Sequence, residues 1–568
     1  MKKKKWLNLT VSAALALVSL SACAENANNA NTSPNASASG STSLSPSGST
    51  SENSSEDAKL DPVTIKWYVN LSWWKYPGEW GTDKFSQFIR DKFGLNIEFQ
   101  TPATDDGQKL ASMIASADVP DLVTVEGWNN SQKPLIQAGL VQPLDDLIPK
   151  YAPSFRDEIY NDVWNWYKAP DGKNYGLPNY AYSSEQLKPG QKLEPNGGFT
   201  LRKDIYDQLG RPDVTSPEQF LSVLERVKNE VKTYDGKPLI PLQLYDGIGQ
   251  SINWLIQYFN TSYEDKDGNW VDVRFQPHYY EALKFLNEAN NRGLISKDNF
   301  TDTRDAINEK VASGRVFSMM TAPQDFSNTN GPMRTLFQAD HKAQYETFVL
   351  KNYEGEEPVL QDIRGMGWLF TMVGKNTKYA DRITKMLQFL NSDEGQYMIQ
   401  FGWEGETYTK TSDGLFAPTQ EYLDLNKTGK AAPKWGMGFN LMANWLTVKD
   451  LIPPQTDPEE KYVQELKKPL EKYSFNLMAN TNRIDSGDSR WNEMRQKELE
   501  FTTYWNKQLV RMITSKSEAD LKKNYDESLA QLKKMGWEKW YEFQNEGYQK
   551  TKEILGMKNG YPTDSTND

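Results

Sequence analysis

The chain has 568 residues, a formal net charge of −11 at pH 7, one cysteine and two histidines. The acidic balance argues against a nucleic-acid partner, because binding to a phosphate backbone requires clustered Lys and Arg side chains. The cysteine and histidine counts exclude a disulfide-stapled fold and a zinc site built from these residues, so we expect no metal and no other cofactor.

The first 22 residues have the pattern of a bacterial export signal. Residues 2–5 are all lysine, and the apolar run over 6–20 is too short to span a bilayer comfortably. The run ends in Leu-Ser-Ala followed by Cys23, which resembles a lipobox. We therefore expect residues 1–22 to be a lipoprotein signal peptide and Cys23 to carry a diacylglycerol anchor. The alternative is an ordinary secretory signal with an incidental cysteine.

The segment after the cysteine is predicted to be a disordered tether, so that residues 23–60 form the lipidated cysteine and its linker. Residues 24–57 are mostly Ser, Asn, Ala, Gly, Thr and Pro, with almost no large apolar side chain. Such a segment cannot bury enough surface to offset its chain entropy.

The next stretch alternates between strand and helix patterns. It predicts strands over 63–69, 95–99 and 121–125, and helices over 83–93 and 110–117. This alternation indicates βαβ units and a mostly parallel sheet. Right-handed crossovers then bring the loops after the strands to one edge of the sheet, where open α/β sheets bind ligands.

The same alternation continues further along the chain. A serine N-cap at Ser216 begins a helix, and another helix is predicted over 279–292. Short buried strands are predicted over 316–320 and 367–373, followed by a helix over 383–390. Beyond about residue 433 the pattern changes to long polar helices, one of which carries an apolar face formed by Leu521, Tyr525, Leu529 and Leu532.

Several stretches in this order carry a family resemblance. They are the lipobox, Ser-Ala-Asp-Val-Pro-Asp-Leu at 116–122, Tyr-Gly-Leu-Pro at 175–178, Leu-Arg-Lys-Asp-Ile-Tyr-Asp-Gln-Leu-Gly at 201–210, Gly-Arg-Val-Phe-Ser-Met-Met at 314–320 and Gln-Phe-Gly-Trp-Glu-Gly-Glu-Thr-Tyr at 400–408. Over nearly all of the mature chain, the sequence resembles the extracellular solute-binding proteins of bacterial ABC importers, specifically the large family 1 lipoproteins of Gram-positive bacteria.

The resemblance implies an α/β fold of the two-lobe, periplasmic-binding-protein-like type (type II), with a long helical C-terminal region. The lobes would be joined by a multi-strand hinge and close on a solute. Lobe one is expected over 60–180 plus 316–375, and lobe two over 185–315 plus 378–430. Residues 431–568 would form a helical C-terminal extension packed on the lobes.

Aromatic residues make up 12% of the chain, and some of them are candidates for binding ring-shaped ligands. Trp73, Trp74 and Trp80 lie in the loop after the first strand, and Trp128 follows the third. On the binding edge of the sheet, these rings can stack on the apolar faces of sugars. The alternative is that they fill the core beneath the loops.

Four further candidates lie where the hinge and the second lobe are expected. Tyr180 and Tyr182 follow the Leu-Pro turn at the hinge, with core packing as the alternative. Arg202 can form a bidentate contact with a ligand carboxylate, or it can be a salt-bridged scaffold residue. Trp254 lies in an apolar helical stretch, where core packing is favoured.

The last candidates lie in the second half of the body. Trp368 follows Gly367, and the nearby Gly365 and Gly367 would let a ligand approach the backbone closely. Trp403 with Glu404 is a pairing of an aromatic ring with an acid. Residues 265–269 resemble a calcium loop only in part, because the glycine comes two places early and no acid stands at the twelfth position.

We therefore expect a membrane-tethered extracellular receptor that captures a solute, with an oligosaccharide as the leading ligand class, and delivers it to the permease subunits of an ABC importer. No catalytic motif is present. Whether the sugar is neutral or contains uronates stays open. The alternatives are a surface-tethered glycan-cleaving enzyme, which would need two carboxylates across a cleft, and a peptide receptor on the same fold.

Overall fold

The computed structural model describes residues 60–558, apart from 105–106, 128–129, 246–247, 322–330, 457 and 478–487. The predicted signal peptide, Cys23, almost all of the tether and Trp128 lie outside the described residues. Residues 59–568 form one compact unit. In the part of the chain that is described, no helix combines the length and the apolar character needed to cross a membrane.

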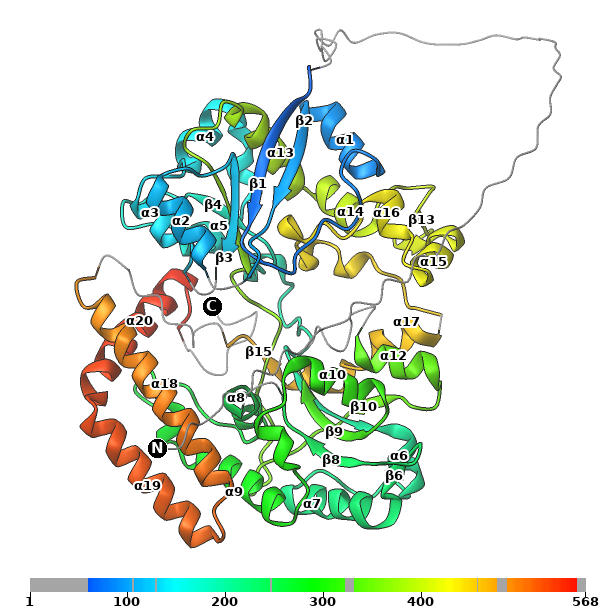
Figure 1. The fold of residues 1–568 in the computed structure, drawn as a ribbon, viewed down its shortest axis with the longest axis vertical. Coiled ribbons are helices and arrows are strands. Elements are labelled where there is room, and N and C mark those ends of the chain that lie inside the picture. Colours follow the sequence, from blue (N-terminus) through cyan, green and yellow to red (C-terminus); the bar gives the residue numbers. More distant parts are fainter. Residues whose placement is uncertain are drawn as a thin grey trace, which may run out of the picture. The chain divides into compact units, whose positions relative to one another are not determined.

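Two larger sheets organise this unit (Figure 1). The first has the strand order β2-β1-β3-β12-β4 and consists of β1 Val63–Val69, β2 Leu95–Gln100, β3 Leu122–Glu126, β4 Gly176–Pro178 and β12 Leu369–Val373. Strand β1 pairs in parallel with β2 and β3, as the alternating pattern predicts. Strand β12 runs antiparallel to β3 and β4. The sheet is therefore mixed, because β12 enters it from a distant part of the chain.

Helices cover the first sheet, and together they form what we call the first lobe. They are α1 Lys84–Phe93, α2 Gln108–Ser116, α3 Lys133–Gln137, α4 Leu144–Tyr151, α5 Asn161–Trp166, α13 Ala380–Asn391 and α14 Asp393–Phe401. Helix α1 begins where Asp83 accepts a hydrogen bond from the Ser86 backbone N–H at 2.9 Å, and it ends at the left-handed Gly94. Its buried face, which includes Phe85 and Ile89, joins the core of the first lobe.

The second sheet has the order β10-β5-β9-β8 and consists of β5 Gly198–Arg202, β8 Ile240–Gln243, β9 Val316–Thr321 and β10 Tyr345–Thr347. Strand β5 lies antiparallel to β9 and β10, and β8 lies parallel to β9. The expected assignment of 316–375 to lobe one differs from this topology, because only β12 joins the first sheet. The local sequence of a short apolar strand does not indicate which strand it pairs with. The sequence pattern therefore could not assign β9 and β12 to different sheets.

The second sheet and its helices form the second lobe. The helices are α6 Lys203–Gln208, α7 Pro217–Arg226, α8 Ile248–Tyr258, α9 Pro277–Asn291, α10 Arg304–Ala312, α12 Pro332–Ala339 and α17 Pro458–Glu465, and a small hairpin is formed by β6 Thr233–Tyr234 and β7 Lys237–Pro238. The predicted capping box at the start of α7 is confirmed, since Ser216 and Gln219 each bond to the other's backbone N–H.

Helix α13 packs against α1 and α4 in the first lobe rather than in the second. The expected placement of 378–430 in lobe two differs from this. The apolar face of α13, with Ile383, Met386 and Leu387, is compatible with either lobe, and only the tertiary contacts decide between them. Later in the chain come β13 Tyr408–Lys410, β14 Phe416–Pro418, α15 Gln420–Lys427 and α16 Ala431–Trp435, and α16 contacts α1 of the first lobe.

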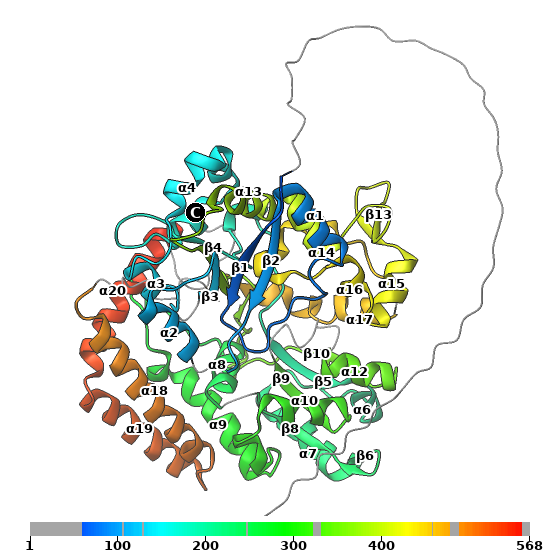
Figure 2. The same cartoon turned by 45° about the horizontal axis from the view of Figure 1, so that its top comes forward.

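Three long helices follow near the C-terminus: α18 Trp491–Ile513, α19 Glu518–Lys534 and α20 Trp537–Leu555. Helices α18 and α19 pack on α9, and Figures 1 and 2 both show the three helices along one side of the second lobe. The end of α20 reaches α5, where Ile554 and Leu555 pack on a core cluster of the first lobe. Among the described residues, 436–475 contain short turns, the eight-residue helix α17 and strand β15 Ser474–Phe475, and no helix as long as α18, α19 or α20.

Three segments connect the lobes, and we call them the hinge segments: 179–197, 362–368 and 443–473. They are hydrogen-bonded to one another or to their flanking strands. The Tyr182 backbone N–H donates to the Gly365 carbonyl at 2.9 Å, and Ile363 donates to the Glu194 carbonyl at 3.1 Å. Just before the second segment, β11 Leu360–Gln361 pairs in parallel with β15. The hinge segments therefore run together between the two sheets.

Candidate functional site: a cleft at the hinge

A cavity of about 1850 Å³ lies along the hinge segments and is lined by residues of both lobes. Its lining is rich in rings, and the aromatic residues are Trp73, Trp166, Tyr167, Tyr180, Tyr182, Trp368, Phe401, Tyr408, Phe416, Tyr422, Trp445 and Trp491. Amide side chains are the second large group: Asn130, Gln132, Asn196, Gln361, Gln400, Asn426, Asn440, Gln455 and Gln464. The cavity therefore offers apolar ring faces together with hydrogen-bonding groups.

One wall of the cavity is built on a pair of stacked indoles. The rings of Trp73 and Trp368 lie with centroids 5.9 Å apart and planes 9° apart. Trp73 is 57% exposed, which is unusual for so large an apolar side chain. A ring left exposed in the wall of a cavity can accept a second flat surface.

Gly367 fixes the position of Trp368. Its φ of +110° is readily adopted by glycine and rarely by residues with a side chain. A Cβ atom at this position would lie only 2.5 Å from the Pro178 Cβ. The close approach lets Asn179 accept from the Leu369 backbone N–H through its side-chain oxygen at 2.6 Å. Both glycines that were expected to let a ligand approach the backbone, Gly365 and Gly367, line the cavity. The Cβ position of Gly367 faces the neighbouring residues Pro178 and Asn179. Gly365, by contrast, has no atom within 4 Å of such a Cβ.

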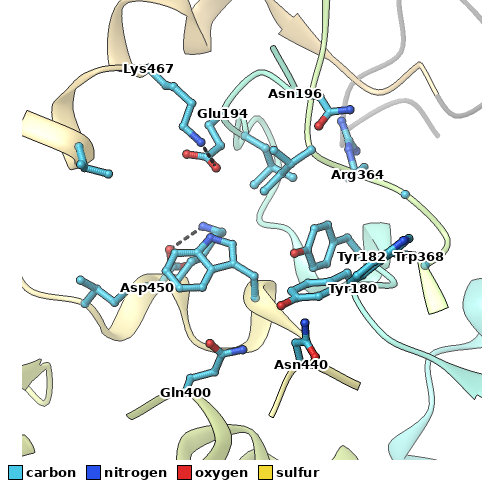
Figure 3. A pocket seen from close by; sticks show the side chains of 18 of the residues that line it. Tyr180, Tyr182, Glu194, Asn196, Arg364, Trp368, Gln400, Asn440, Asp450 and Lys467 are labelled. Carbon is cyan, nitrogen blue, oxygen red and sulfur yellow. Dashed lines mark hydrogen bonds and ion pairs between the residues drawn. The ribbon is translucent and has the colours of Figure 1, made fainter. Parts of the chain in front are cut away.

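Tyr180 and Tyr182 lie on the adjacent hinge segment, with rings edge to face at 6.3 Å. Figure 3 shows both with Trp368 around the open part of the cavity. Burial raises the pKa of both hydroxyls, most strongly for Tyr182. Both tyrosines therefore keep their O–H protons at neutral pH and can donate to a ligand oxygen.

Amides and ion pairs complete the lining. The Asn440 side-chain oxygen accepts from the Trp74 indole N–H at 2.9 Å, so Trp74 orients an amide that lines the cavity. Figure 3 shows Lys467 and Glu194 forming an ion pair across two hinge segments. Lys449 pairs with its neighbour Asp450 at 2.6 Å.

Four of the residues singled out in the sequence analysis come together at the cavity: Trp73, Tyr180, Tyr182 and Trp368. The other described candidates lie elsewhere. Trp74 is buried in the core of the first lobe, and Trp80 packs edge-on against Phe99 beneath the same loop. For these two tryptophans the packing matches the alternative of filling the core.

Arg202 lies fully buried in the second lobe, away from the cavity. Its guanidinium donates two hydrogen bonds to Asp204, at 2.8 and 2.6 Å, and a third to the Gly314 carbonyl at 2.8 Å. It also lies 4.5 Å from the centre of the Tyr234 ring. This geometry corresponds to the salt-bridged scaffold alternative.

The remaining candidates also lie outside the cavity lining. Trp254 is half-buried against the core of the second lobe. Trp403 is half-buried with the Lys84 ammonium 5.1 Å from its ring, and Glu404 is exposed and paired with Lys410 at 3.0 Å. Two residues that lie close to this pair in the sequence do line the cavity: Phe401 at the end of α14 and Tyr408 in β13.

Sequence reasoning missed several lining residues, among them Arg364, Trp445, Lys467 and Trp491. Trp445 and Lys467 lie in the irregular segments before and after helix α17. An irregular segment between periodic ones is a common place for binding residues, and that was the available signal. Nothing in the local sequence of Arg364 marks it as a residue of the cavity.

One cluster of possible metal ligands lies outside the cavity. Within the described residues, ligand atoms of His278, Glu281 and Glu354 lie within 4.8 Å of one another. Burial, followed by a hydrogen bond with Glu354 and the charge of that residue, raises the pKa of Glu281 to about 7.

The segment over 265–269, which resembles a calcium loop only in part, forms a turn. The Asp265 carboxylate accepts hydrogen bonds from the backbone N–H groups of Asp267 and Asn269.

Comparison with known proteins identifies a family and a set of relatives. The profile described as "Bacterial extracellular solute-binding protein" matches residues 84–406, more than half of the chain. A curated relative, the fructooligosaccharide ABC transporter substrate-binding protein FusA of Streptococcus pneumoniae, is 26% identical over 269 residues. The match covers 44% of this chain and 49% of the relative, so the chain spans about half the length of the curated relative it matches.

Solved structures share the fold. FusA of S. pneumoniae in complex with kestose superposes with a TM-score of 0.66 at 16% identity, over 86% of this chain and 100% of that one. A solute-binding protein from Bifidobacterium longum infantis, described as HMO-binding and ABC-transporter-associated, gives a TM-score of 0.63 at 15% identity, over 86% and 99%. The expected two-lobe α/β fold with a helical C-terminal region is confirmed by these similarities.

Proposed function

The chain belongs to the family of bacterial extracellular solute-binding proteins, and from this premise we propose that it captures an oligosaccharide and delivers it to an ABC importer. The observation that carries the proposal is the cavity lining, in which twelve aromatic and nine amide side chains border one space. Sugar rings present C–H faces that stack on aromatic rings and hydroxyls that bond to amides. The names of the relatives, which concern fructooligosaccharides and an HMO-binding protein, support the same ligand class.

The size of the cavity favours an oligomer over a single sugar. Small-molecule sites usually enclose roughly 300–1,000 Å³, and this cavity measures about 1850 Å³. The lining side chains come from both lobes and from the hinge segments. A ligand that contacts both lobes binds their closed arrangement more tightly, and this differential affinity drives closure.

The cellular location is part of the proposal. Family membership places the protein outside the cytoplasm. We propose in addition that residues 1–22 are removed, that Cys23 carries lipid, and that the Ser- and Asn-rich segment over 24–57 tethers the body to the outer face of the cell membrane. Permease subunits of an importer would then receive the solute.

The proposal assigns no catalytic residue. Glycoside hydrolysis needs two carboxyl groups that flank the scissile bond. Among the described residues that line the cavity, the carboxyl groups are those of Glu194, Asp450 and Glu471. Two of them are held in ion pairs, Glu194 with Lys467 and Asp450 with Lys449.

Titration calorimetry with a panel of defined oligosaccharides tests the proposal. The expected result is saturable binding of one sugar class, with the sugar recovered uncut after prolonged incubation. A parallel melting experiment should show stabilisation of about 2.7 kcal/mol when the sugar is present at one hundred times its Kd. Cleavage of the sugar would overturn the proposal in favour of an enzyme. Binding of peptides in competition with sugars, or of peptides alone, would overturn the ligand class.

A further inference from the structure

The cavity carries a charge opposite to that of the protein. The chain contains 65 Lys and Arg residues against 76 Asp and Glu residues, so it is acidic as a whole. The described residues that line the cavity include eight lysines and arginines and three carboxyl side chains. Two of the arginines also have acidic partners just outside the lining, Asp362 and Glu459. Within the lining itself, the cations therefore outnumber the carboxyl groups.

The three carboxyl groups in the lining leave little negative charge facing the ligand. Glu194 and Asp450 are paired with lysines that also line the cavity. The third, Glu471, is half-buried, and burial followed by the charge of Glu194 raises its pKa. Two of the three carboxylates that an anionic ligand would meet are therefore already paired with a cation.

Arg364 is the cation that the fold holds most firmly. It is 4% exposed, and its partner Asp362 is 1% exposed. The Asp362 Oδ2 atom accepts from Arg364 Nε at 2.8 Å and lies 2.6 Å from Nη2, while Oδ1 accepts from the Arg364 backbone N–H at 2.9 Å. The guanidinium is thereby fixed from one side by a carboxylate on the same hinge segment.

The other side of this guanidinium lacks an acceptor. Arg364 Nη1 is buried and has no hydrogen-bond partner. Buried donors in folded proteins are almost always paired, because an unpaired donor has lost its hydrogen bonds to water. Arg364 borders the cavity, and Figure 3 shows it there together with Asn196. The acceptor that completes Nη1 is therefore one that a ligand can supply.

A second cation adds to the positive charge at this point. Lys192 also lines the cavity, and its ammonium lies 3.7 Å from the centre of the Phe475 ring. The backbone carbonyl of Phe475 accepts from the Asp362 backbone N–H at 2.9 Å. Lys192 belongs to the hinge segment that runs beside residues 361–363, where the Asn196 backbone N–H donates to the Gln361 carbonyl at 2.7 Å. Lys192 therefore lies close to the ion pair of Arg364 and Asp362.

We propose that the oligosaccharide is acidic and that one of its carboxylates binds at Arg364 and Lys192. This inference rests on the proposed function, since it names the chemical class of the ligand in the same cleft. A uronic acid residue supplies a planar carboxylate, which a guanidinium recognises with directional, charge-assisted hydrogen bonds. The aromatic walls would hold the neighbouring sugar rings, and the remaining cations would attract the ligand into the cleft.

The decisive experiment compares two ligands that differ only in charge. The purified protein is titrated with a series of uronic acid oligomers of defined linkage and with the same oligomers after reduction of their carboxyl groups to alcohols. For one linkage, the acidic form should bind at least about tenfold more tightly, the size expected for one charge-assisted contact. Its affinity should fall as salt is raised from low to physiological ionic strength, because salt screens the attraction.

Variants locate the contact. Lys192→Gln removes one cation, and Arg364→Lys keeps the charge but removes the planar fork of donors. Asp362→Asn with Arg364→Gln removes the ion pair as a unit and avoids a buried, unpaired carboxylate. Each should reduce the ratio of the affinities for the acidic and the reduced oligomer, because only the acidic oligomer loses a carboxylate contact. Binding of the reduced oligomer measures the general effect of each substitution on the cleft. Arg226→Gln, at an exposed site on α7 where the arginine pairs with Glu230, is the matched control for the loss of one charge.

The outcomes separate the two claims. Equal binding of the acidic and reduced oligomers would overturn the acidic ligand and leave the oligosaccharide receptor standing. A charge preference that survives in all the Arg364 and Lys192 variants would overturn the assigned contact. If no sugar of any charge binds, the proposed function fails and this inference fails with it.

Discussion

The indole rings of Trp73 and Trp368 stack face to face, with centroids 5.9 Å apart and ring planes 9° apart. Trp73 follows the first strand of the first lobe, and Trp368 comes from the second hinge segment, so the pair joins two distant parts of the chain. The pair forms a flat wall of the cleft, and Trp73 is its exposed member.

Replacing either indole by alanine should weaken sugar binding. We expect Trp73→Ala to raise the Kd about tenfold, because the exposed ring loses its stacking surface for a sugar. The melting temperature should change little, since Trp73 is largely outside the core. Calorimetry measures the Kd. Trp254→Ala is the control: it should lower stability and leave the Kd unchanged, because Trp254 packs outside the cavity. An unchanged Kd for Trp73→Ala would place the sugar elsewhere in the cleft.

Gly367→Ala should destabilise the protein by about 1–3 kcal/mol, because a side chain is strained at positive φ and its Cβ would meet Pro178 at 2.5 Å. Binding should weaken as well, since the change displaces Trp368. Chemical denaturation and calorimetry measure the two effects. Gly365→Ala is a close control, because its Cβ would enter open space. If both variants behave alike, the strain at Gly367 is not what positions the indole.

Arg202→Gln should reduce stability without altering sugar affinity. The change leaves Asp204 without its two hydrogen bonds and removes the one to Gly314. Breaking a buried ion pair by removing one partner typically costs about 3–5 kcal/mol. Urea denaturation should show this loss as a lower midpoint. A folded Arg202→Gln variant with a greatly raised Kd would instead indicate that Arg202 takes part in ligand binding.

The Glu281 and Glu354 pair should make stability depend on pH. The pKa of Glu281 is raised to about 7 in the folded protein, so the folded state binds this proton more tightly than the unfolded state. The pair therefore costs no stability below the ordinary glutamate pKa, and its destabilising effect grows as the pH rises to about 7. His278 and Glu356 are the other charged groups nearby.

Glu281→Gln should accordingly stabilise the protein at pH 8 and have little effect at pH 4. Because the carboxyl group is partly exposed, solvent screening reduces the expected gain to about 1 kcal/mol. Urea midpoints at several pH values measure it. Glu354→Gln should give the same trend, because it removes a hydrogen bond and a charge that raise the pKa of Glu281. Equal effects of Glu281→Gln at pH 4 and pH 8 would contradict the interpretation.

Local features of this protein follow from the sequence alone. Helix α1 begins at the Asp83 cap and ends at Gly94, strand β1 spans Val63–Val69 as predicted, and the Ser216 capping box forms. These features depend on interactions within a few residues, namely side-chain caps, left-handed glycines and the alternation of apolar residues. The order of the motifs along the chain also indicates the family.

Only the tertiary structure decided which elements pair and which side chains meet. Strand β9 joins the second sheet and β12 the first, although both are short apolar strands in the same part of the chain. Arg202 is buried in a scaffold, whereas Arg364 borders the cleft. The physical reason is that burial and partners arise from contacts between residues far apart in the chain, and an apolar strand or a single arginine carries no local signal of the surface it will meet.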